Sequence, residues 1–113
     1  MTASLLEVFG ERDPARRRAA MQRTFADSVI FHDPEGTVTG YEALQDKIEA
    51  LYAGAPPDWA FQAAAPAADV ADLGRATWTF GPPDGPEAVR GMDIGIIADG
   101  QIATMYTIIE PAP

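Results

Sequence analysis

Residues 88–109 read AVRGMDIGIIADGQIATMYTII, and this stretch decides the fold. It contains two extended, largely apolar runs joined by Asp99-Gly100. Asp-Gly between two such runs is a strong short-range signal for a β-hairpin, because both residues tolerate the positive φ angles of a two-residue turn. The stretch therefore predicts a pair of antiparallel strands over residues 88–98 and 101–109.

The sequence just before the hairpin predicts further strands. Trp59, Phe61 and Ala63 alternate with other residues in one segment, and Trp78 and Phe80 share a face in another. Loops are expected at the Ala/Pro-rich residues 63–68 and at residues 82–86. The second half of the chain is therefore expected to be a run of antiparallel strands.

The first half of the chain carries the signals of helix starts. Two Ser/Thr-x-x-Glu motifs have the spacing of capping boxes, and Asp13-Pro14 places an N-cap residue before a proline at the first helical position. We expect helices after each signal, with a strand and turn before the last. Helices segregated from a run of strands predict an α+β fold. The capping boxes are Ser4 with Glu7 and Thr39 with Glu42, the helices span residues 4–9, 14–26 and 40–53, the strand runs from Ser28 to Asp33 and the turn covers residues 33–36.

Length and composition limit the classes of protein. The 113 residues are enough for one domain, expected over residues 1–113. Without cysteine there is no disulfide, thiolate metal site or cysteine nucleophile. No apolar run is long enough to cross a membrane, and the N-terminus lacks the features of a signal peptide, so a cytoplasmic location is expected. The net charge of −9 argues against a nucleic-acid partner, and the Arg16–Arg18 run is expected to be a solvated helix face that pairs with acids.

Three motifs add a resemblance to a known family: Phe25-Ala26-Asp27, Phe31-His32-Asp33-Pro34 and Gly40-Tyr41-Glu42-Ala43-Leu44. With the order of the elements and the late Asp99-Gly100-Gln101-Ile102, they resemble the nuclear transport factor 2-like, or SnoaL-like, superfamily of ketosteroid isomerases and polyketide cyclases. The resemblance covers nearly the whole chain. It implies a cone-shaped, curved antiparallel sheet (an α+β barrel) packed with N-terminal helices around an apolar pocket. It also implies a homodimer formed through the outer face of the sheet.

The resemblance implies roles for two acids. Asp33 matches the general-base aspartate of ketosteroid isomerase, and Asp93 matches its oxyanion-stabilising aspartic acid. The tyrosine of that enzyme's oxyanion hole falls near Phe9, which has no hydroxyl. Epoxide hydrolases of the same superfamily use an Asp–Arg–Asp set, but strand alternation aims Arg75 and Arg90 away from the expected pocket face.

Strand alternation describes the pocket independently of the family. If Asp33 points inward, Val29 and Phe31 on the same strand point inward too. If Asp93 points inward, Gly91 and Gly95 lie on the same inner face. Glycines on both sides of an acid would leave an empty volume for a ligand. Met92, Ile94 and Ile96 would then give the sheet an apolar outer face. The expected pocket lining is Phe9, Val29, Phe31, Tyr52, Trp78, Phe80, Met105 and Ile109.

Each acid has a structural interpretation beside the functional one. An aspartate before proline often accepts a hydrogen bond from a backbone N–H two residues on, which would account for Asp33. A solvent-facing or edge position would account for Asp93, because aspartate is depleted inside strands. In the functional interpretation, a buried Asp93 has a raised pKa and donates a hydrogen bond to a developing enolate, while the wetter Asp33 accepts a proton.

The sequence therefore supports two functions. The first is an isomerase or cyclase that performs acid–base chemistry next to a carbonyl of a small apolar molecule, with Asp33 and Asp93 as catalytic residues and with no cofactor or metal. The second is a noncatalytic ligand-binding or interaction module of the same fold. The lone His32 cannot build a metal site, and alternation places it on the outer face.

Overall fold

The computed structural model describes residues 1–110. Three helices and seven strands follow one another along the chain, and the α+β class predicted from the sequence is confirmed. The elements are η1 (Ser4–Phe9), α1 (Pro14–Thr24), β1 (Phe25–Asp33), β2 (Gly36–Thr39), α2 (Gly40–Ala53), β3 (Ala60–Ala63), β4 (Ala68–Val70), β5 (Leu73–Gly81), β6 (Val89–Ala98) and β7 (Gln101–Glu110).

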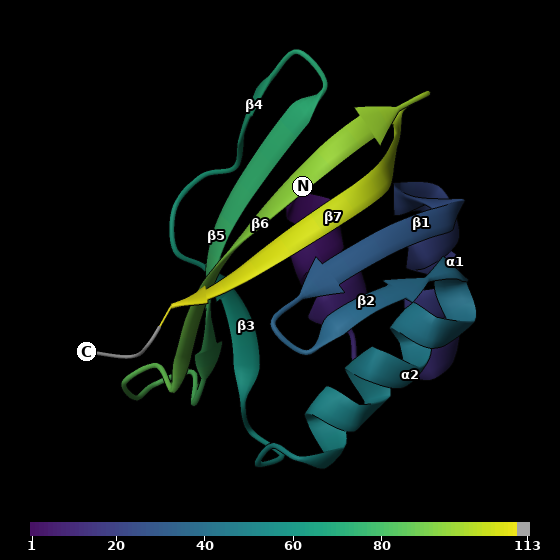
Figure 1. Cartoon of the computed structure of the whole chain (residues 1–113). Coiled ribbons are helices and arrows are strands. Elements are labelled where there is room, and N and C mark those ends of the chain that lie inside the picture. Colours follow the sequence, from purple (N-terminus) through teal and green to yellow (C-terminus); the bar gives the residue numbers. More distant parts are fainter. Residues whose placement is uncertain (111–113) are drawn as a thin grey trace.

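The strands form one curved, unclosed sheet in the order β2-β1-β7-β6-β5-β3, with β4 also paired to β5 (Figure 1). Neighbouring strands are antiparallel except for β1 and β7, which run parallel. The expected curved, mainly antiparallel sheet is present, and this parallel pair is an addition that the sequence did not predict. It arises because the last strand of the chain inserts between the early β1–β2 hairpin and the later strands β3 to β6.

The β6–β7 hairpin is the longest antiparallel pair, and it turns where the sequence predicted. Asp99 and Gly100 both have positive φ, 53° and 77°, as a two-residue hairpin turn requires. Ile97 pairs with Ile102, whereas Ile96 pairs with Thr104, so Ala103 has no partner of its own and forms a β-bulge. Beyond this bulge Asp93 lies opposite Thr107.

The helix starts agree only in part with the sequence signals. Asp13 caps α1, because its carboxylate accepts a hydrogen bond from the Arg16 N–H at 2.9 Å. The two predicted capping boxes are wrong. Ser4 lies inside η1, buried, and its hydroxyl donates to Sδ of Met105 at 3.8 Å, while Thr39 makes no side-chain cap and ends strand β2.

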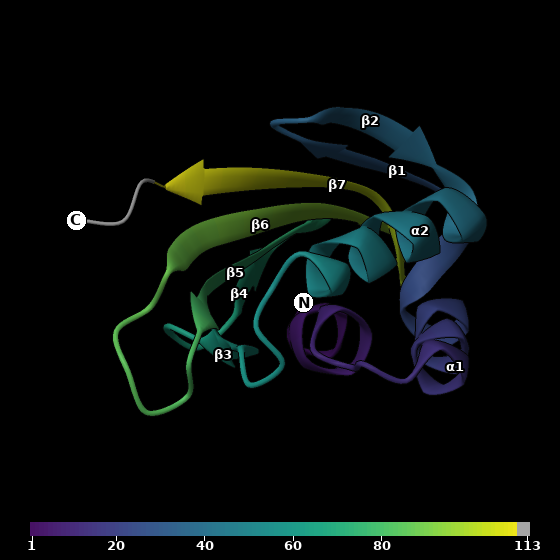
Figure 2. The same ribbon diagram turned by 90° about the horizontal axis from the view of Figure 1, so that it is seen from below.

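The helices lie on the concave side of the sheet, where the main core forms (Figure 2). The core joins Val8 of η1, Met21 of α1 and Leu44 and Ile48 of α2 to Val29 and other apolar residues of β1 and β7. Among the described residues, no helix combines the length and the apolar character that spanning a bilayer requires.

The Arg16–Arg18 run is only partly a solvated face. Arg17 is fully buried, donates to Glu49 at 2.6 Å and to the backbone carbonyl of Glu11 at 2.8 Å, and so ties α1 to α2. Arg18 pairs with Glu42 of α2 at 2.8 Å. The expected pairing with acids is present, but the expected exposure is wrong for Arg17 because α2 packs over it.

Candidate functional site

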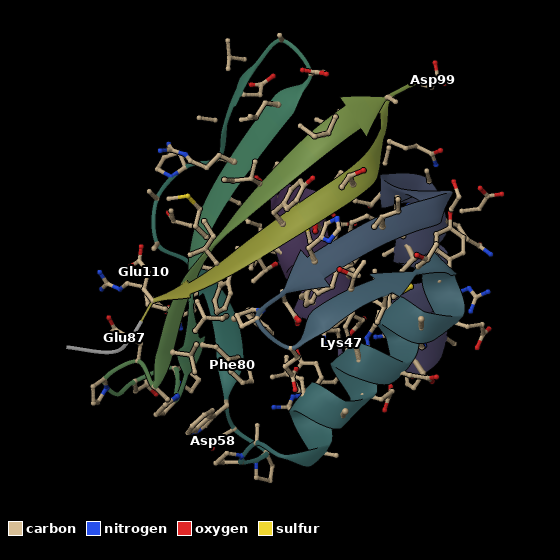
Figure 3. The ribbon with its side chains drawn as sticks, in the orientation of Figure 1. Lys47, Asp58, Phe80, Glu87, Asp99 and Glu110 are labelled. Carbon is tan, nitrogen blue, oxygen red and sulfur yellow. The ribbon has the colours of Figure 1, made fainter. Side chains whose placement is uncertain are left out.

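A cavity of about 740 Å³ lies between one end of the sheet, helix α2 and helix η1. Lys47 of α2 and Phe80 of β5 line two of its sides, and both are labelled in Figure 3. The β1–β2 turn at residues 33–35 contributes to its rim. The cavity is therefore assembled from segments that are far apart in the sequence.

Aromatic side chains form one wall of the cavity. Phe61 of β3 stacks on Phe80 of β5, with ring centroids 4.3 Å apart. The rings of Trp78 and Trp59 meet these two edge-on, at 5.3 and 5.6 Å. Phe9 of η1 is 6.1 Å from Phe61 and extends the wall. A concave wall of this kind suits a flat, apolar molecule.

Asp93 lies in the middle of β6, lines the cavity and is 4% exposed. Two donors reach the same carboxyl oxygen, Oδ1: the indole Nε1 of Trp78 at 3.1 Å and the hydroxyl of Thr107 at 2.7 Å. Within residues 1–110, no hydrogen-bond donor reaches Oδ2. Oδ2 is therefore the oxygen left to meet a ligand.

The environment of Asp93 favours its neutral form. Burial raises the pKa of the carboxyl, and the hydrogen bonds from Thr107 and Trp78 offset this rise only in part. Because both donors occupy Oδ1, the proton of the neutral acid sits on Oδ2. In this form Asp93 is a single O–H donor set in an apolar wall.

The two glycines beside Asp93 do not leave empty space above it, which corrects the sequence-based expectation. A Cβ on Gly91 would fall within the indole of Trp78, 2.7 Å from Cε2 and Cη2. A Cβ on Gly95 would lie 2.9 Å from Sδ of Met1. Gly91 instead lets Trp78, its cross-strand partner, lie flat against β6 with its Nε1 directed at Asp93.

Asp33 ends β1 at the rim of the same cavity. Its Oδ1 accepts the backbone N–H of Glu35 at 2.9 Å, which is the turn contact that the Asp-Pro sequence predicted. Its Oδ2 lies 2.9 Å from Nζ of Lys47 on α2. Lys47 also reaches Oε1 of Glu35 at 3.3 Å. Both oxygens of Asp33 therefore already have a donor.

Lys47 is held as a cation. Burial acts to lower its pKa, but the hydrogen bonds with Asp33 and Glu35 outweigh burial, and the pKa is raised. A lysine amine becomes a nucleophile when its pKa falls. The environment of Lys47 therefore argues against Schiff-base chemistry.

Thr107 lies on the strand between the two acids. On one side of β7, Thr107 is the cross-strand partner of Asp93. On the other side β1 runs parallel to β7, and His32 is paired with Tyr106. The next residues along these two strands are Asp33 and Thr107, which therefore lie side by side. Adjacent strands are about 4.8 Å apart, so the backbones that carry the two acids are separated by roughly 10 Å.

The predicted lining agrees with the cavity at five positions: Phe9, Phe31, Trp78, Phe80 and Ile109. Val29 and Met105 instead lie fully buried in the main core, because η1, α1 and α2 cover that part of the sheet. Tyr52 is turned away, since its hydroxyl donates to the carbonyl of Phe9 and its ring lies 4.3 Å from the guanidinium carbon of Arg12.

The remaining polar candidates lie elsewhere. His32 stacks on Tyr106 on the outer face, with ring centroids 4.6 Å apart, and hydrogen bonds to Thr37. Arg75 and Arg90 are not part of the cavity wall. Across residues 1–110, no group of three or more His, Cys, Asp or Glu side chains has metal-binding geometry.

Sequence reasoning missed two polar residues of the site, although signals for both exist. Thr107 lies between Met105 and Ile109 with period two, so it shares their face. Lys47 is the only lysine of the chain and lies three residues after Leu44 and four before Leu51, on the apolar face of α2. A single charged residue on an apolar helix face indicates a specific partner.

The fold and the cavity define a class of protein: an open, curved sheet that holds helices on its concave side and a pocket at one end, as in nuclear transport factor 2-like proteins. The sequence profile of the SnoaL-like domain family matches residues 3–105. The chain therefore belongs to the SnoaL-like domain family. A search of curated proteins returned no match.

Solved structures support the same fold. A candidate isomerase of the SnoaL-like family from Agrobacterium tumefaciens strain C58 is 23% identical, with 96% of this chain and 92% of that chain covered and a TM-score of 0.86. A candidate SnoaL-like polyketide cyclase from Jannaschia sp. CCS1 is 16% identical, covering 96% and 81% (TM-score 0.76). A protein with a ketosteroid isomerase-like fold from Catenulispora acidiphila DSM 44928, in complex with trimethylamine, is 17% identical, covering 95% and 82% (TM-score 0.73). At these identities the likeness extends to the fold alone.

Proposed function

We propose that the protein is an isomerase or cyclase that moves a proton next to the carbonyl group of a small, apolar molecule. The observation that carries this proposal is the carboxyl of Asp93: it is buried in an aromatic wall, its pKa is raised, and no donor among the described residues reaches its Oδ2. A group of this kind donates a hydrogen bond to an oxygen on which negative charge develops.

Asp33 supplies the matching base. Its carboxylate removes a proton from the carbon next to the carbonyl, the electrons move onto the carbonyl oxygen, and Asp93 Oδ2–H stabilises the resulting enolate. In an isomerisation Asp33 then returns the proton to the far carbon of the enolate, so that no atom is gained or lost. In a cyclisation the enolate carbon attacks a second carbonyl of the same molecule, and the alkoxide formed there takes up the proton that Asp33 removed.

The cavity favours a substrate that is flat and uncharged. Its wall is built from Phe61, Phe80 and the two tryptophans, and its rim carries more carboxylates than cations. An anionic substrate would be repelled by Asp33, Glu35 and Asp46, against which only Lys47 among the described lining residues offers a positive charge.

The test uses cyclohex-3-enone, whose isomerisation to the conjugated cyclohex-2-enone is followed by ultraviolet absorbance. The wild-type protein is expected to accelerate the reaction. Asp33→Asn should lower the rate by at least a hundredfold, because the amide cannot accept the proton. Asp93→Asn should cost less, because its amide N–H still reaches the enolate oxygen but is a weaker donor than an acid.

The control is Asp69→Asn, which removes an exposed aspartate of β4 outside the cavity and should leave the rate unchanged. Full activity in folded Asp33→Asn protein would contradict the assignment of the base. Equal rates in the wild-type protein and in all variants would mean that neither aspartate contributes to the reaction and that the solvent catalyses it.

A noncatalytic ligand-binding module is the second candidate function, and one observation favours it. Both oxygens of Asp33 are occupied, by the Glu35 N–H and by Lys47, so the base is not free in this arrangement. 2-Naphthol separates the two functions because its oxygen resembles that of an enolate. Quenching of Trp59 and Trp78 fluorescence by 2-naphthol, without turnover of cyclohex-3-enone or of larger enones, would support a binder.

A further inference from the structure

We propose that Lys47 is a positioning residue for Asp33: its ammonium group, carried by α2, fixes the orientation of the carboxylate at the cavity rim, where the carboxylate accepts a proton. The inference rests on the function proposed above, in which Asp33 is the base. It adds a residue that acts through Asp33 without touching the reacting carbon.

The contacts of Lys47 are directional. Nζ lies 2.9 Å from Oδ2 of Asp33 and 3.3 Å from Oε1 of Glu35. The Glu35 backbone N–H holds the other oxygen, Oδ1, at 2.9 Å. One donor therefore comes from the turn itself and one from the helix, and together they set the plane of the carboxylate.

Among the ion pairs of the described residues, Lys47–Asp33 is the one in which both side chains are mostly buried. The side chains of Lys47 and Asp33 are only 19% and 13% exposed, whereas Arg18 and Glu42 are 36% and 83% exposed. Water screens an exposed pair more strongly than a mostly buried one. Lys47 therefore holds the Asp33 carboxylate more firmly than an exposed partner would.

The other titratable groups that line the cavity are acids, so Lys47 is the only cation among the described residues that line it. Glu35 follows Asp33 in the turn, Asp46 projects from α2, and Asp93 faces the same cavity from β6. His32 is adjacent in sequence but lies on the outer face against Tyr106.

The link also joins two separate elements at the cavity mouth. Lys47 belongs to α2, and Asp33 and Glu35 belong to the β1–β2 turn that faces this helix (Figure 3). The position of the base thus depends on a helix that contributes no other partner to it.

The test compares wild-type protein with Lys47→Met, Lys47→Gln and Lys47→Arg. The values of kcat and KM are measured with cyclohex-3-enone, and the free energy of unfolding is measured by urea titration. In Lys47→Met and Lys47→Gln, kcat should fall roughly tenfold while KM changes little, because the base is no longer held in line with the proton that it removes.

Lys47→Arg should restore kcat in large part, because the guanidinium can still donate to the carboxylate. Arg18→Met serves as the matched control: it removes the cation of an exposed pair with the same helix and should leave kcat unchanged. A purely structural role of Lys47 would alter stability without changing kcat, and an unchanged kcat in both uncharged variants of Lys47 overturns the proposal.

The two proposals fail separately. If wild-type protein does not turn over the enone, the proposed function loses its support, yet a difference in the ¹³C resonance of the Asp33 carboxyl between wild type and Lys47→Met at neutral pH still reports whether Lys47 holds the carboxylate. If turnover is present but kcat does not depend on Lys47, the base remains and only the positioning role is lost.

Discussion

The indole of Trp78 lies flat over Gly91 and donates from Nε1 to Oδ1 of Asp93 across the β5–β6 pair at 3.1 Å. One aromatic side chain thus forms part of the apolar wall and also selects the oxygen of Asp93 that carries the proton. Removing water from around the acid raises its pKa, and the hydrogen bonds that orient it lower the pKa by a smaller amount. This balance leads to the first predictions.

Trp78→Phe should raise the pKa of Asp93 further. The phenyl ring keeps the apolar surroundings but removes the N–H that stabilises the charged carboxylate. The ¹³C shift of the Asp93 carboxyl, followed against pH, measures the change. Trp59→Phe is the control, since Trp59 lines the cavity without a hydrogen bond to Asp93. A midpoint that is the same in both variants would mean that the indole N–H does not govern this acid.

Asp93→Asn should stabilise the protein at high pH. The pKa of Asp93 is raised on folding, so its contribution to stability is complete below the unfolded-state pKa of about 3.9 and is lost as the pH rises through the folded-state pKa. Asparagine has no such loss. The free energy of unfolding gained by Asp93→Asn should grow by about 1.4 kcal/mol for each pH unit between the unfolded-state pKa and the folded-state pKa. Above the folded-state pKa it should stay constant.

Urea unfolding of wild-type and Asp93→Asn protein at intervals between pH 4 and pH 9 measures this gain. Asp69→Asn, at an exposed position of β4, should show no pH-dependent difference from wild type. A gain for Asp93→Asn that shrinks as the pH rises would reverse the sign of the argument and exclude a buried acid with a raised pKa.

Gly91→Ala should destabilise the fold by about 1–3 kcal/mol, because the new methyl group displaces the indole of Trp78 from β6. The shift of that indole should also break its hydrogen bond to Asp93, which the Nε1–H resonance of Trp78 reports by NMR. Gly54→Ala is the matched control, since its Cβ would make only an ordinary contact, 3.6 Å from the carbonyl of Ala50. Equal stability of the two variants would contradict this packing.

Asp13→Ala should cost about 1 kcal/mol of unfolding free energy, because it removes the side-chain cap on the Arg16 N–H at the start of α1. Asp13→Asn should be nearly neutral, since asparagine caps helices as well as aspartate does. Urea titrations of the two variants provide the comparison. If alanine and asparagine are equivalent, the cap contributes nothing measurable.

The homodimer through the outer sheet face stays a prediction, and the surface offers a way to test it. Ile30 of β1 and Tyr106 and Ile108 of β7 are 38%, 46% and 51% exposed. We expect sedimentation equilibrium to give twice the mass of the chain, and Ile108→Glu to give the mass of one chain. Leu6→Glu, at an exposed position of η1, should leave the mass unchanged. A wild-type monomer at all concentrations would end the prediction.

Local signals in the sequence predicted the parts of the fold that depend on neighbouring residues. Asp99-Gly100 was sufficient for the last hairpin, because a two-residue turn needs residues that accept positive φ. Asp13-Pro14 was sufficient for the start of α1. Ser4 had the motif of a capping box, but it lies on the buried side of η1. Its hydroxyl therefore donates to Met105 and does not cap the helix.

Long-range pairing was beyond the reach of those signals. Nothing in the local pattern of β1 states that its parallel partner is the last strand, 70 or more residues away. Alternation predicts that Phe31, Asp33 and Asp93 face the pocket, and all three line the cavity. It did not separate the cavity wall from the core beneath it, so Val29 and Met105 were misplaced, because that distinction depends on where the helices cover the sheet.

The single unpaired residue Ala103 has an effect at the far end of its strand. Every pairing of β7 beyond it is offset by one position, and without that offset Asp93 would meet Tyr106 in place of Thr107. The large side chain of Tyr106 would then take the place of the small side chain of Thr107, and it would fill the part of the cavity next to Asp93. The β-bulge near the tip of the hairpin lies some 10 Å or more from the carboxyl. It thereby keeps the volume next to Asp93 open to a small molecule.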